Sequence, residues 1–390
     1  MSGIRRVAVI INLEWLLVHH HQVFAGIQRF ARENGRWECS VSPHADLLMC
    51  GDEPGELPDG IIARATPRLA EMARRAGVPL VNVWLNSRAK NLPTVVHDAE
   101  ASGRMAARHL LERGFRNFGY MGLADDNFSR LQLAGFRAVL GGAGCGCSEN
   151  WVARRYARKA ENWQQFQTQL GQWIDQWPLP IGVFVAHDLL CRYLAEACAL
   201  RGMEIPLAVA LIGSFNESVV SGHTEPALSS IDFGFERVGH RAAALLDAMM
   251  DGRPVGVEPI RIPPADLIAR RSSDAFAVSD PVVAQALRFI SGHSHEEIDV
   301  ELVADHVFTT RRTLARSFQK CLGRTVHETI TKIRLDRVKQ RLLEPNPMIK
   351  TIATECGFRD AIQLCKIFQR VEGASPSEYR AERLAGNPHS

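Results

Sequence analysis

The chain has 390 residues, of which 46% are hydrophobic and 23% are charged, as is usual for a soluble globular protein of two or three domains. Its net charge of +3 is unevenly divided, because residues 281–390 hold 17 Lys and Arg against 13 Asp and Glu, whereas residues 1–280 hold 29 against 30. No stretch approaches the roughly 20 apolar residues that a membrane span needs, and the short apolar run near the N-terminus favours a first strand over a signal peptide.

The N-terminal part alternates apolar strands with amphipathic helices. Strands are predicted at 6–13, 37–43, 59–65, 79–84 and from 93, with helices at 22–34, 67–76 and up to 114. Further strands are predicted at 117–123, near 152–158, at 182–188 and at 208–215, separated by helices at 129–140, 163–176 and 188–201. Apolar β-branched runs separated by helices of about 10–15 residues are typical of parallel sheets covered on both faces.

The number of strands exceeds what one compact sheet would hold. Two similar α/β lobes joined by crossing strands are therefore predicted, with a cleft between them. Ligands of such sheets bind beyond the carboxyl ends of the strands. These ends are the segments Leu13–His21, Trp84–Asn86, Leu123–Arg130, His187–Asp188 and Phe215–Asn216.

A polar segment from Arg270 to Pro281 follows the α/β part and ends in Asp-Pro, a typical helix start. The predicted organisation is an α/β domain at 1–270, a linker at 271–280 and an all-helical domain at 281–390. Helices are expected at 281–291, 299–307, 310–321, 326–343, 349–356, 360–371 and 376–383. Residues 310–341 hold 10 basic and 2 acidic residues, a local charge that favours a polyanionic partner over a membrane or an acidic metabolite.

The segment LVADHVFTTRRTLARSFQKCLG (302–323) recurs fifty residues later as IATECGFRDAIQLCKIFQRVEG (352–373). At this spacing Leu302 pairs with Ile352, Asp305 with Glu355, Phe308 with Phe358, Leu314 with Leu364, Arg316 with Lys366, Phe318 with Phe368 and Gly323 with Gly373. Each copy predicts a short helix, a tight turn and a second helix that begins at Thr310 or Asp360, both competent N-caps. This is the helix-turn-helix pattern, whose second helix offers its first residues to base edges in the major groove.

The tail resembles the DNA-binding domain of the AraC/XylS family of transcription activators, two helix-turn-helix units bridged by one long helix. The resemblance covers about residues 281–382 and rests on Ile352-Ala353, Cys356-Gly357-Phe358, Phe368, Gly373, Ser375-Pro376 and Tyr379-Arg380. It implies base-reading positions at Arg312, Ala315 and Arg316 in the first unit and at Ala361, Ile362 and Lys366 in the second. Thr310, Arg311, Lys320 and Gln363 complete the expected DNA contacts.

Because the second set has few hydrogen-bonding groups, most sequence discrimination is expected from the first unit. The first turn also departs from the family pattern. Val307 stands where the second unit has Gly357, so this turn is expected to avoid a positive φ.

The front part resembles the sugar-binding domain of the LacI/periplasmic-binding-protein superfamily. The matching motifs are Val96-His97-Asp98 with Gly103, VFVAHDLLCRYLAEACALRGMEIP, VALIGSFNES, LSSIDFGFERVGHRAAALL and IPPADLIARRSS. One family, the xylose operon regulators, joins such a sensor to an AraC-type tail, and the junction ARRSSDAFAVSDPVVAQALRFI resembles theirs. The resemblance implies promoter DNA as a partner, a small sugar effector with D-xylose as the candidate, a homodimer, and RNA polymerase if the protein activates.

The expected sugar pocket departs from the superfamily pattern at two positions. Gln132 stands where an arginine commonly holds sugar hydroxyls, and Phe215 stands where an aspartate is common, which leaves Asp188 of the usual polar trio. Trp84, Asn86, His187 and Asn216 are the residues that could compensate. Asp188 is interpreted as a ligand or a helix N-cap, and Trp84 as a pocket or a core residue. The alternative function is therefore the same architecture with a sensor that responds to another metabolite or to none.

No enzyme motif occurs: there is no GxGxxG, no P-loop, no nucleophile elbow and no plausibly spaced acidic pair. An enzyme is not predicted, and neither is a cofactor. The nine cysteines have no CxxC spacing, so free thiols in a reducing cytoplasm are favoured over a metal site at Cys145 and Cys147. The tract His19-His20-His21 is interpreted as part of a strand-to-helix loop, and no metal is predicted.

Overall fold

A computed structural model describes residues 4–13, 18–42, 57–222, 225–274, 280–342 and 347–384. It divides into two compact units. The first unit holds residues up to 102 together with 126–131 and 233–265, and the second holds the rest of the α/β part together with the helical tail. Cys50, part of the predicted strand end Leu13–His21 and residues 275–279 of the predicted linker lie outside the described residues.

The first unit is built on a four-stranded parallel sheet with the order β2-β1-β3-β4. Its strands are β1 (Arg5–Ile10), β2 (Trp37–Val41), β3 (Gly60–Ala63) and β4 (Leu80–Asn82), and β5 (Val95–His97) pairs in parallel with β11 (Ile260–Ile262). The helices are α1 (Val18–Asn34), α3 (Pro67–Ala76) and α9 (Phe235–Met250). These elements confirm the predicted alternation of strands and helices.

Helices α1 and α9 pack at very close range. A Cβ on Gly26 would lie 2.0 Å from the carbonyl oxygen of Glu236, and one on Gly239 would lie 1.9 Å from that of Val23. Each helix therefore needs a glycine where the other crosses it. The interpretation of His19, His20 and His21 as loop residues is wrong, because α1 begins at Val18 and all three are helical.

The second unit contains a six-stranded sheet with the order β12-β10-β9-β8-β6-β7, in which only β12 is antiparallel to its neighbour. The strands are β6 (Asn117–Leu123), β7 (Ser148–Val152), β8 (Ile181–Val185), β9 (Val209–Ser214), β10 (Ser229–Asp232) and β12 (Asp266–Ile268). Helices α4 (Ala99–Glu112) and α5 (Asn127–Gly142) begin in residues of the first unit and continue in the second. The other helices of this α/β part are α6 (Ala160–Ile174), α7 (Asp188–Ala199), α8 (Ser218–Ser221) and the 3-10 turn η1 (Arg271–Ser273). The strand predicted near 152–158 is misplaced, since β7 ends at Val152 and residues 154–157 form a turn.

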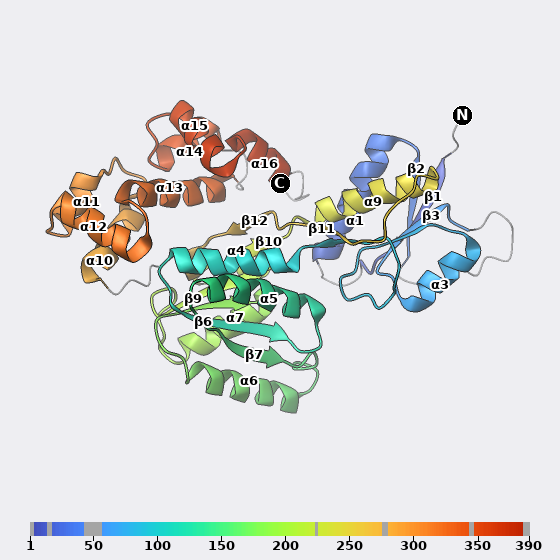
Figure 1. Ribbon diagram of the computed structural model, residues 1–390, viewed down its shortest axis with the longest axis horizontal. Helices are drawn as coiled ribbons and strands as arrows, with labels where there is room; N and C mark the ends of the chain where they lie inside the picture. The colour runs from blue at the N-terminus through green and yellow to red at the C-terminus, as the bar shows by residue number, and fades with distance from the viewer. Residues whose placement is uncertain are drawn as a thin grey trace. The chain divides into compact units, whose positions relative to one another are not determined.

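The tail of the second unit is entirely helical in the part that the structure describes, as predicted (Figure 1). Its helices are α10 (Pro281–His293), α11 (Val300–His306), α12 (Arg311–Leu322), α13 (Val326–Leu342), α14 (Ile349–Glu355), α15 (Ala361–Glu372) and α16 (Pro376–Leu384). Figure 1 shows α13 running between the group α10–α12 and the group α14–α16.

Helix α13 belongs to two hydrophobic cores at once. Its first half contributes Val326, Ile330 and Ile333 to the core of α10–α12. Its second half contributes Leu335, Val338 and Leu342 to the core of α14–α16. Helix α13 therefore holds both helical groups together by burying apolar side chains in each.

Nowhere in the described part of the chain does a helix have the length and apolar character that crossing a membrane requires.

Candidate nucleic-acid interface and effector site

The two helix-turn-helix units begin and end their second helices with the same devices. The side chain of Thr310 accepts a hydrogen bond from the backbone N–H of Thr313, and that of Asp360 accepts one from Gln363. Both predicted N-caps are thus confirmed. Gly323 and Gly373 close α12 and α15 in the left-handed conformation, with φ of 67° and 78°.

A capping box opens the helix that follows each unit. Thr325 and Glu328 exchange hydrogen bonds at the start of α13, and Ser375 and Glu378 do so at the start of α16. The Glu side chain reaches back to the first backbone N–H while the hydroxyl accepts from the Glu N–H. The fifty-residue spacing therefore holds from the second helix of each unit onward.

In the first helix of each unit the spacing is forty-nine residues. The structure pairs the buried Val303 and Ala304 with the buried Ile352 and Ala353, and Leu302, predicted as the partner of Ile352, is exposed. The predicted pairings of Asp305 with Glu355 and of Phe308 with Phe358 are wrong by the same single residue. The turn of the first unit is one residue shorter than that of the second.

This short turn changes the backbone at Phe308. The N–H of Phe308 donates to Asp305 O as the N–H of Gly357 donates to Thr354 O, so Phe308 occupies the place of Gly357. Phe308 has a φ of 52° and Gly357 a φ of 79°. The expectation that the first turn avoids a positive φ is therefore wrong. Val307 has a φ of −98°, and the positive φ occurs at the next residue, Phe308.

The predicted base-reading residues of the first unit share one surface of α12. Arg312, Ala315, Arg316 and Lys320 are exposed, while Leu314 and Phe318 are fully buried in the core. Arg311 is also exposed and forms an ion pair of 2.6 Å with Glu301 of α11. Guanidinium groups in this position have the geometry to donate two hydrogen bonds to guanine O6 and N7 or to phosphate oxygens.

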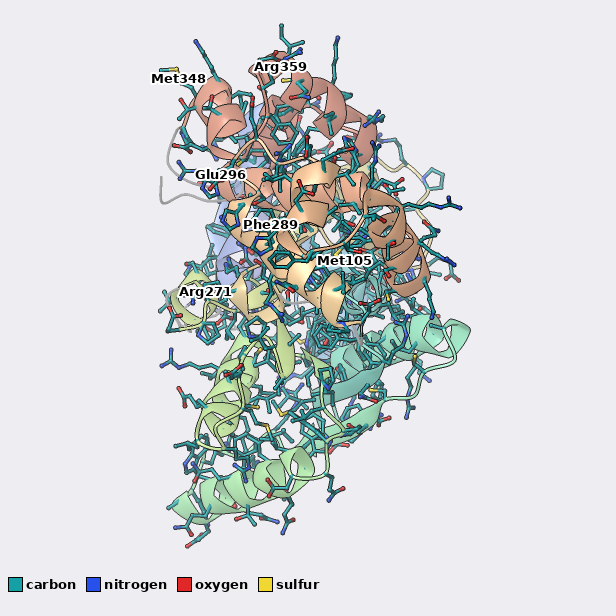
Figure 2. All side chains as sticks on the ribbon, turned by 90° about the vertical axis from the view of Figure 1, so that its left-hand side faces the viewer. Met105, Arg271, Phe289, Glu296, Met348 and Arg359 are labelled. Carbon is teal, nitrogen blue, oxygen red and sulfur yellow. The ribbon has the colours of Figure 1, made fainter. Side chains whose placement is uncertain are left out.

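The second helix-turn-helix unit presents a different surface. Ile362 and Lys366 are exposed and Ala361 is half-buried, so this helix offers mainly apolar side chains and one cation. The amide oxygen of Gln363 accepts a hydrogen bond from the backbone N–H of Arg359, which occupies part of its hydrogen-bonding capacity within the turn. Figure 2 shows Arg359 and Met348 at the outer surface of this unit, pointing away from its helices.

Two of the predicted effector residues lie in the first compact unit of the fold, which contains the four-stranded sheet. Trp84 follows β4 and is half-buried, with the guanidinium of Arg64 4.7 Å from the centre of its ring. Asn86 donates a hydrogen bond of 2.8 Å to Asp126 and accepts one from the backbone N–H of Asn127. Asp126 lies in the predicted strand-end segment Leu123–Arg130, but Arg64 was not predicted, because it reaches Trp84 only through the tertiary fold.

The same unit contains an aromatic cluster that sequence reasoning missed. The ring of His97 lies 5.0 Å from Phe128, 5.0 Å from Phe233 and 5.1 Å from Phe235, edge to face in each case. Burial lowers the pKa of His97 to about 4, so this imidazole is neutral at physiological pH. Its Nε2 atom is buried and has no hydrogen-bond partner among the described residues. Phe128 is more than a hundred residues from Phe233 and Phe235, so the cluster cannot be recognised from sequence spacing.

Asp188 lies in the second compact unit of the fold, where it is the first residue of α7 and does not cap the helix. The N-cap position is His187, so the N-cap interpretation of Asp188 is wrong. The Asp188 carboxylate accepts a 2.7 Å hydrogen bond from the Ser230 hydroxyl and a 2.8 Å one from the N–H of Glu217. Burial raises the pKa of Asp188 to about 7, against the lowering effect of these two hydrogen bonds.

His187, Phe215 and Asn216 gather next to Asp188. The rings of His187 and Phe215 stack with centroids 4.7 Å apart. Phe215 and Asn216 have φ values of 94° and 51°, two consecutive left-handed residues without glycine. The backbone N–H of Asn216 donates to Ser230, and its side-chain oxygen accepts a 2.6 Å hydrogen bond from Arg270. Backbone strain of this kind is concentrated at functional sites.

Arg270 was missed as a member of this cluster, although the motif that contains it was recognised. It is half-buried, and burial lowers its pKa while the nearby Asp188 and Asp232 oppose that shift. Its side chain reaches Asn216, 54 residues earlier in the chain, which no local pattern could indicate.

Gln132 lies fully buried in α5. Its side-chain oxygen accepts a hydrogen bond of 3.3 Å from Tyr120, and its amide group donates one of 3.0 Å to Ser214. These contacts bind Gln132 to the sheet of the second unit. Within the described residues there is no group of three or more His, Cys, Asp or Glu side chains placed to hold a metal ion.

Comparison with known protein families finds two domains in the chain. Residues 107–273 match the periplasmic binding protein-like domain, and residues 303–382 match a helix-turn-helix domain. The predicted fold class, an α/β sensor of the periplasmic-binding-protein type followed by an all-helical DNA-binding domain, is confirmed.

Several known proteins are similar to this chain over most of its length. The xylose operon regulatory protein of Haemophilus influenzae is 26% identical over 370 residues, which are 93% of this chain and 95% of that protein. The protein of the same name from Escherichia coli K12 is 28% identical over 335 residues, 83% of this chain and 84% of that protein. The solved structure of the xylose-binding transcription activator xylR superposes with a TM-score of 0.61 at 24% identity, covering 97% of this chain and 98% of that one.

Proposed function

Because its homologues over most of its length are the xylose operon regulatory proteins, we propose that this chain is a DNA-binding transcription regulator that responds to a small sugar, with D-xylose as the first candidate. The observation that carries the proposal is the pair of capped helix-turn-helix units on α13, with Arg312 and Arg316 exposed on the second helix of the first unit. The fold places two such helices on one chain, the arrangement that reads two neighbouring half-sites of a duplex.

The two units are assigned different tasks. Arg312 and Arg316 supply base-edge contacts, and Arg311 and Lys320 supply phosphate contacts. In the second unit Lys366 contacts phosphate and Ile362 contacts thymine methyl groups, since an exposed isoleucine has no hydrogen bond to offer a base. Sequence discrimination therefore comes mainly from the first unit. The protein acts in the cytoplasm as a homodimer, and it contacts RNA polymerase where it activates.

Binding of the purified chain to restriction fragments from the promoters next to its gene tests the DNA assignment. We expect retention of at least one fragment at low salt, with affinity that falls steeply as salt rises, because basic side chains release counterions from the duplex. Failure to retain any promoter fragment at low salt would remove the basis of the proposal.

A second candidate is the same architecture with an effector other than a pentose. Two observations favour it: Phe215 replaces the expected acidic group, and the Asp188 carboxylate is satisfied by Ser230 and by Glu217 within the sensor. Thermal unfolding of the full chain with a panel of pentoses and hexoses separates the two candidates. A saturable rise in Tm with one sugar supports the first, and no shift with any sugar supports the second.

A further inference from the structure

Helix α13 carries a row of charged side chains that contacts the sensor part of the second compact unit. Its charged residues Lys332, Asp336 and Lys339 follow the i, i+4, i+7 spacing of one helix face. Each pairs with a group of opposite sign on the sensor: Lys332 with Glu112, Asp336 with Arg113 at 3.3 Å, and Lys339 with Asp266 at 3.7 Å. The signs alternate along the row, so only one register of the helix on the sensor satisfies all three pairs.

The central and distal pairs are shielded from solvent. The Arg113 side chain is 4% exposed, and those of Lys339 and Asp266 are 16% and 17% exposed. The hydroxyl of Tyr379 also donates a hydrogen bond to Asp266, and Lys339 forms a second ion pair of 2.6 Å with Glu372. Burial alone would lower the pKa of Lys339, but these carboxylates outweigh it and raise that pKa, so the lysine remains charged.

The same contact is poorly packed in its apolar part. A cavity of about 420 Å³ lies beside the Arg113–Asp336 pair, and its walls include Ile268 of the sensor and Ile333 of α13. The contact therefore depends on charge pairs more than on apolar burial. Interfaces of this kind open readily and weaken as salt rises.

A chain of buried polar groups leads from this contact toward Asp188. Arg113 donates to His109 Nδ1 at 3.1 Å, His109 Nε2 lies 2.8 Å from the Ser273 hydroxyl, and that hydroxyl lies 2.7 Å from the hydroxyl of Ser229. The next residue of β10, Ser230, holds the Asp188 carboxylate. Two consecutive residues of one strand thus serve the candidate effector site and the contact with α13.

We infer that these three pairs form an autoinhibitory clasp, in which the sensor lobe holds α13 and masks its cation Lys332 until the effector releases it. Glu112 neutralises Lys332, which removes positive charge that would attract a duplex, whereas Lys339 also pairs with Glu372 of the tail itself and serves to hold the helix. Arg113 acts as a positioning residue, because it joins the clasp to the buried polar chain. The inference rests on the proposed DNA binding, and it adds the way in which the sensor controls it.

The test removes the two sensor carboxylates of the clasp and leaves every residue of the DNA-binding domain unchanged. In the full chain, Glu112→Gln with Asp266→Asn removes two carboxylates, and promoter affinity without effector is expected to rise about fivefold, with little further response to effector. Asp175→Asn is the matched control, because Asp175 is a sensor carboxylate whose ion pair with Arg201 lies outside the clasp. It should leave promoter affinity within about twofold of wild type.

Hydrogen exchange of the DNA-free chain gives a second readout. Peptides that cover α13 and the last turn of α4 should exchange faster in Glu112→Lys, and the double variant Glu112→Lys with Lys332→Glu should restore wild-type protection. Unchanged exchange in Glu112→Lys would overturn the clasp. Equal promoter affinities of the Glu112→Gln, Asp266→Asn variant and of the Asp175→Asn control would overturn it as well. If wild type binds no promoter fragment, the proposed function fails, and exchange still decides whether the clasp exists.

Discussion

Single residues of one chemical type have different tasks in this protein because their surroundings differ. Arg312 and Arg316 are exposed on the surface of α12, whereas Arg113 is buried at the contact with α13 and Arg270 is half-buried within the sensor. A guanidinium in water has donors to offer a new partner, whereas the two terminal nitrogens of Arg113 already donate to His109 and Asp336. The position of each arginine, and not its presence, indicates what it does.

The first prediction separates base reading from phosphate binding on α12. Arg316→Ala should cost about 1–3 kcal/mol of promoter binding and relax discrimination at one base pair, because it removes contacts to a base edge. Lys320→Ala, one turn later, should weaken all sequences alike and lower the salt slope by about one. Affinities for a promoter fragment and for its point variants, at several salt concentrations, distinguish the two. Equal, sequence-independent losses from both variants would contradict the assignment.

The second prediction concerns the buried carboxyl of Asp188. Burial raises its pKa to about 7, so the folded protein retains a proton that the unfolded chain releases above about pH 4. The folded state binds more protons in this interval, and its free energy of unfolding therefore falls as the pH rises from about 4 to about 7. Asp188→Asn should flatten this fall and make the variant more stable than wild type at about pH 8, by up to about 4 kcal/mol.

Denaturant unfolding at a series of pH values measures this difference. Asp175→Asn is the control, because Arg201 lowers the pKa of Asp175 and its contribution changes only at more acidic pH. A difference between Asp188→Asn and wild type that does not change between about pH 4.5 and about pH 8 would show that Asp188 is ionised in both states.

Among the elements, the two helix-turn-helix turns differ by a single residue. The second turn uses Gly357 for its positive φ, and the shorter first turn places Phe308 there. Phe308 is 94% exposed, so its ring gains nothing from burial while its backbone is strained. Phe358, one residue later in the longer turn, is 6% exposed and packs in the core.

The third prediction follows from this comparison. Phe308→Gly should raise the free energy of unfolding by about 1 kcal/mol, since glycine adopts the left-handed conformation without strain and no buried surface is lost. Gly357→Ala should have the opposite effect and cost more than about 2 kcal/mol, because its Cβ would lie 2.2 Å from the carbonyl oxygen of Ser294. Urea midpoints of the two variants test both signs. A loss of stability in Phe308→Gly would mean that the aromatic ring contributes to the fold.

At the scale of the whole molecule, the proposed function joins two binding events on one chain. Any effector that changes promoter affinity must bind with different strength to the states that bind DNA well and poorly. Thermodynamic linkage then requires that promoter DNA change effector affinity by the same factor. This holds whether the clasp or another element carries the coupling.

The fourth prediction applies that requirement. With the sugar that raises Tm as the probe, the ratio of promoter Kd values without and with sugar should equal the ratio of sugar Kd values without and with promoter. Fluorescence anisotropy gives the first ratio and calorimetry the second. Unequal ratios would contradict a single coupled equilibrium and indicate that DNA and sugar bind to separate populations.

Sequence alone determined the features that depend on residues close together in the chain. The alternation of strands and helices, the helices of the tail, both N-caps and the two copies of the helix-turn-helix unit all follow from local spacing and capping chemistry, and the structure confirms them. The family resemblance extended this reading to the order of the two domains.

Only the tertiary structure decided the rest, because these features depend on contacts between distant residues. The hydrogen bond from Ser230 to the buried Asp188 and the charge row of α13 against the sensor each join segments that local pattern treats separately, and the helical state of His19–His21 and the shift of register before Phe308 became visible only in the fold. A repeat can lose one residue in a turn and remain recognisable, but packing in the core determines which residue then takes the strained backbone.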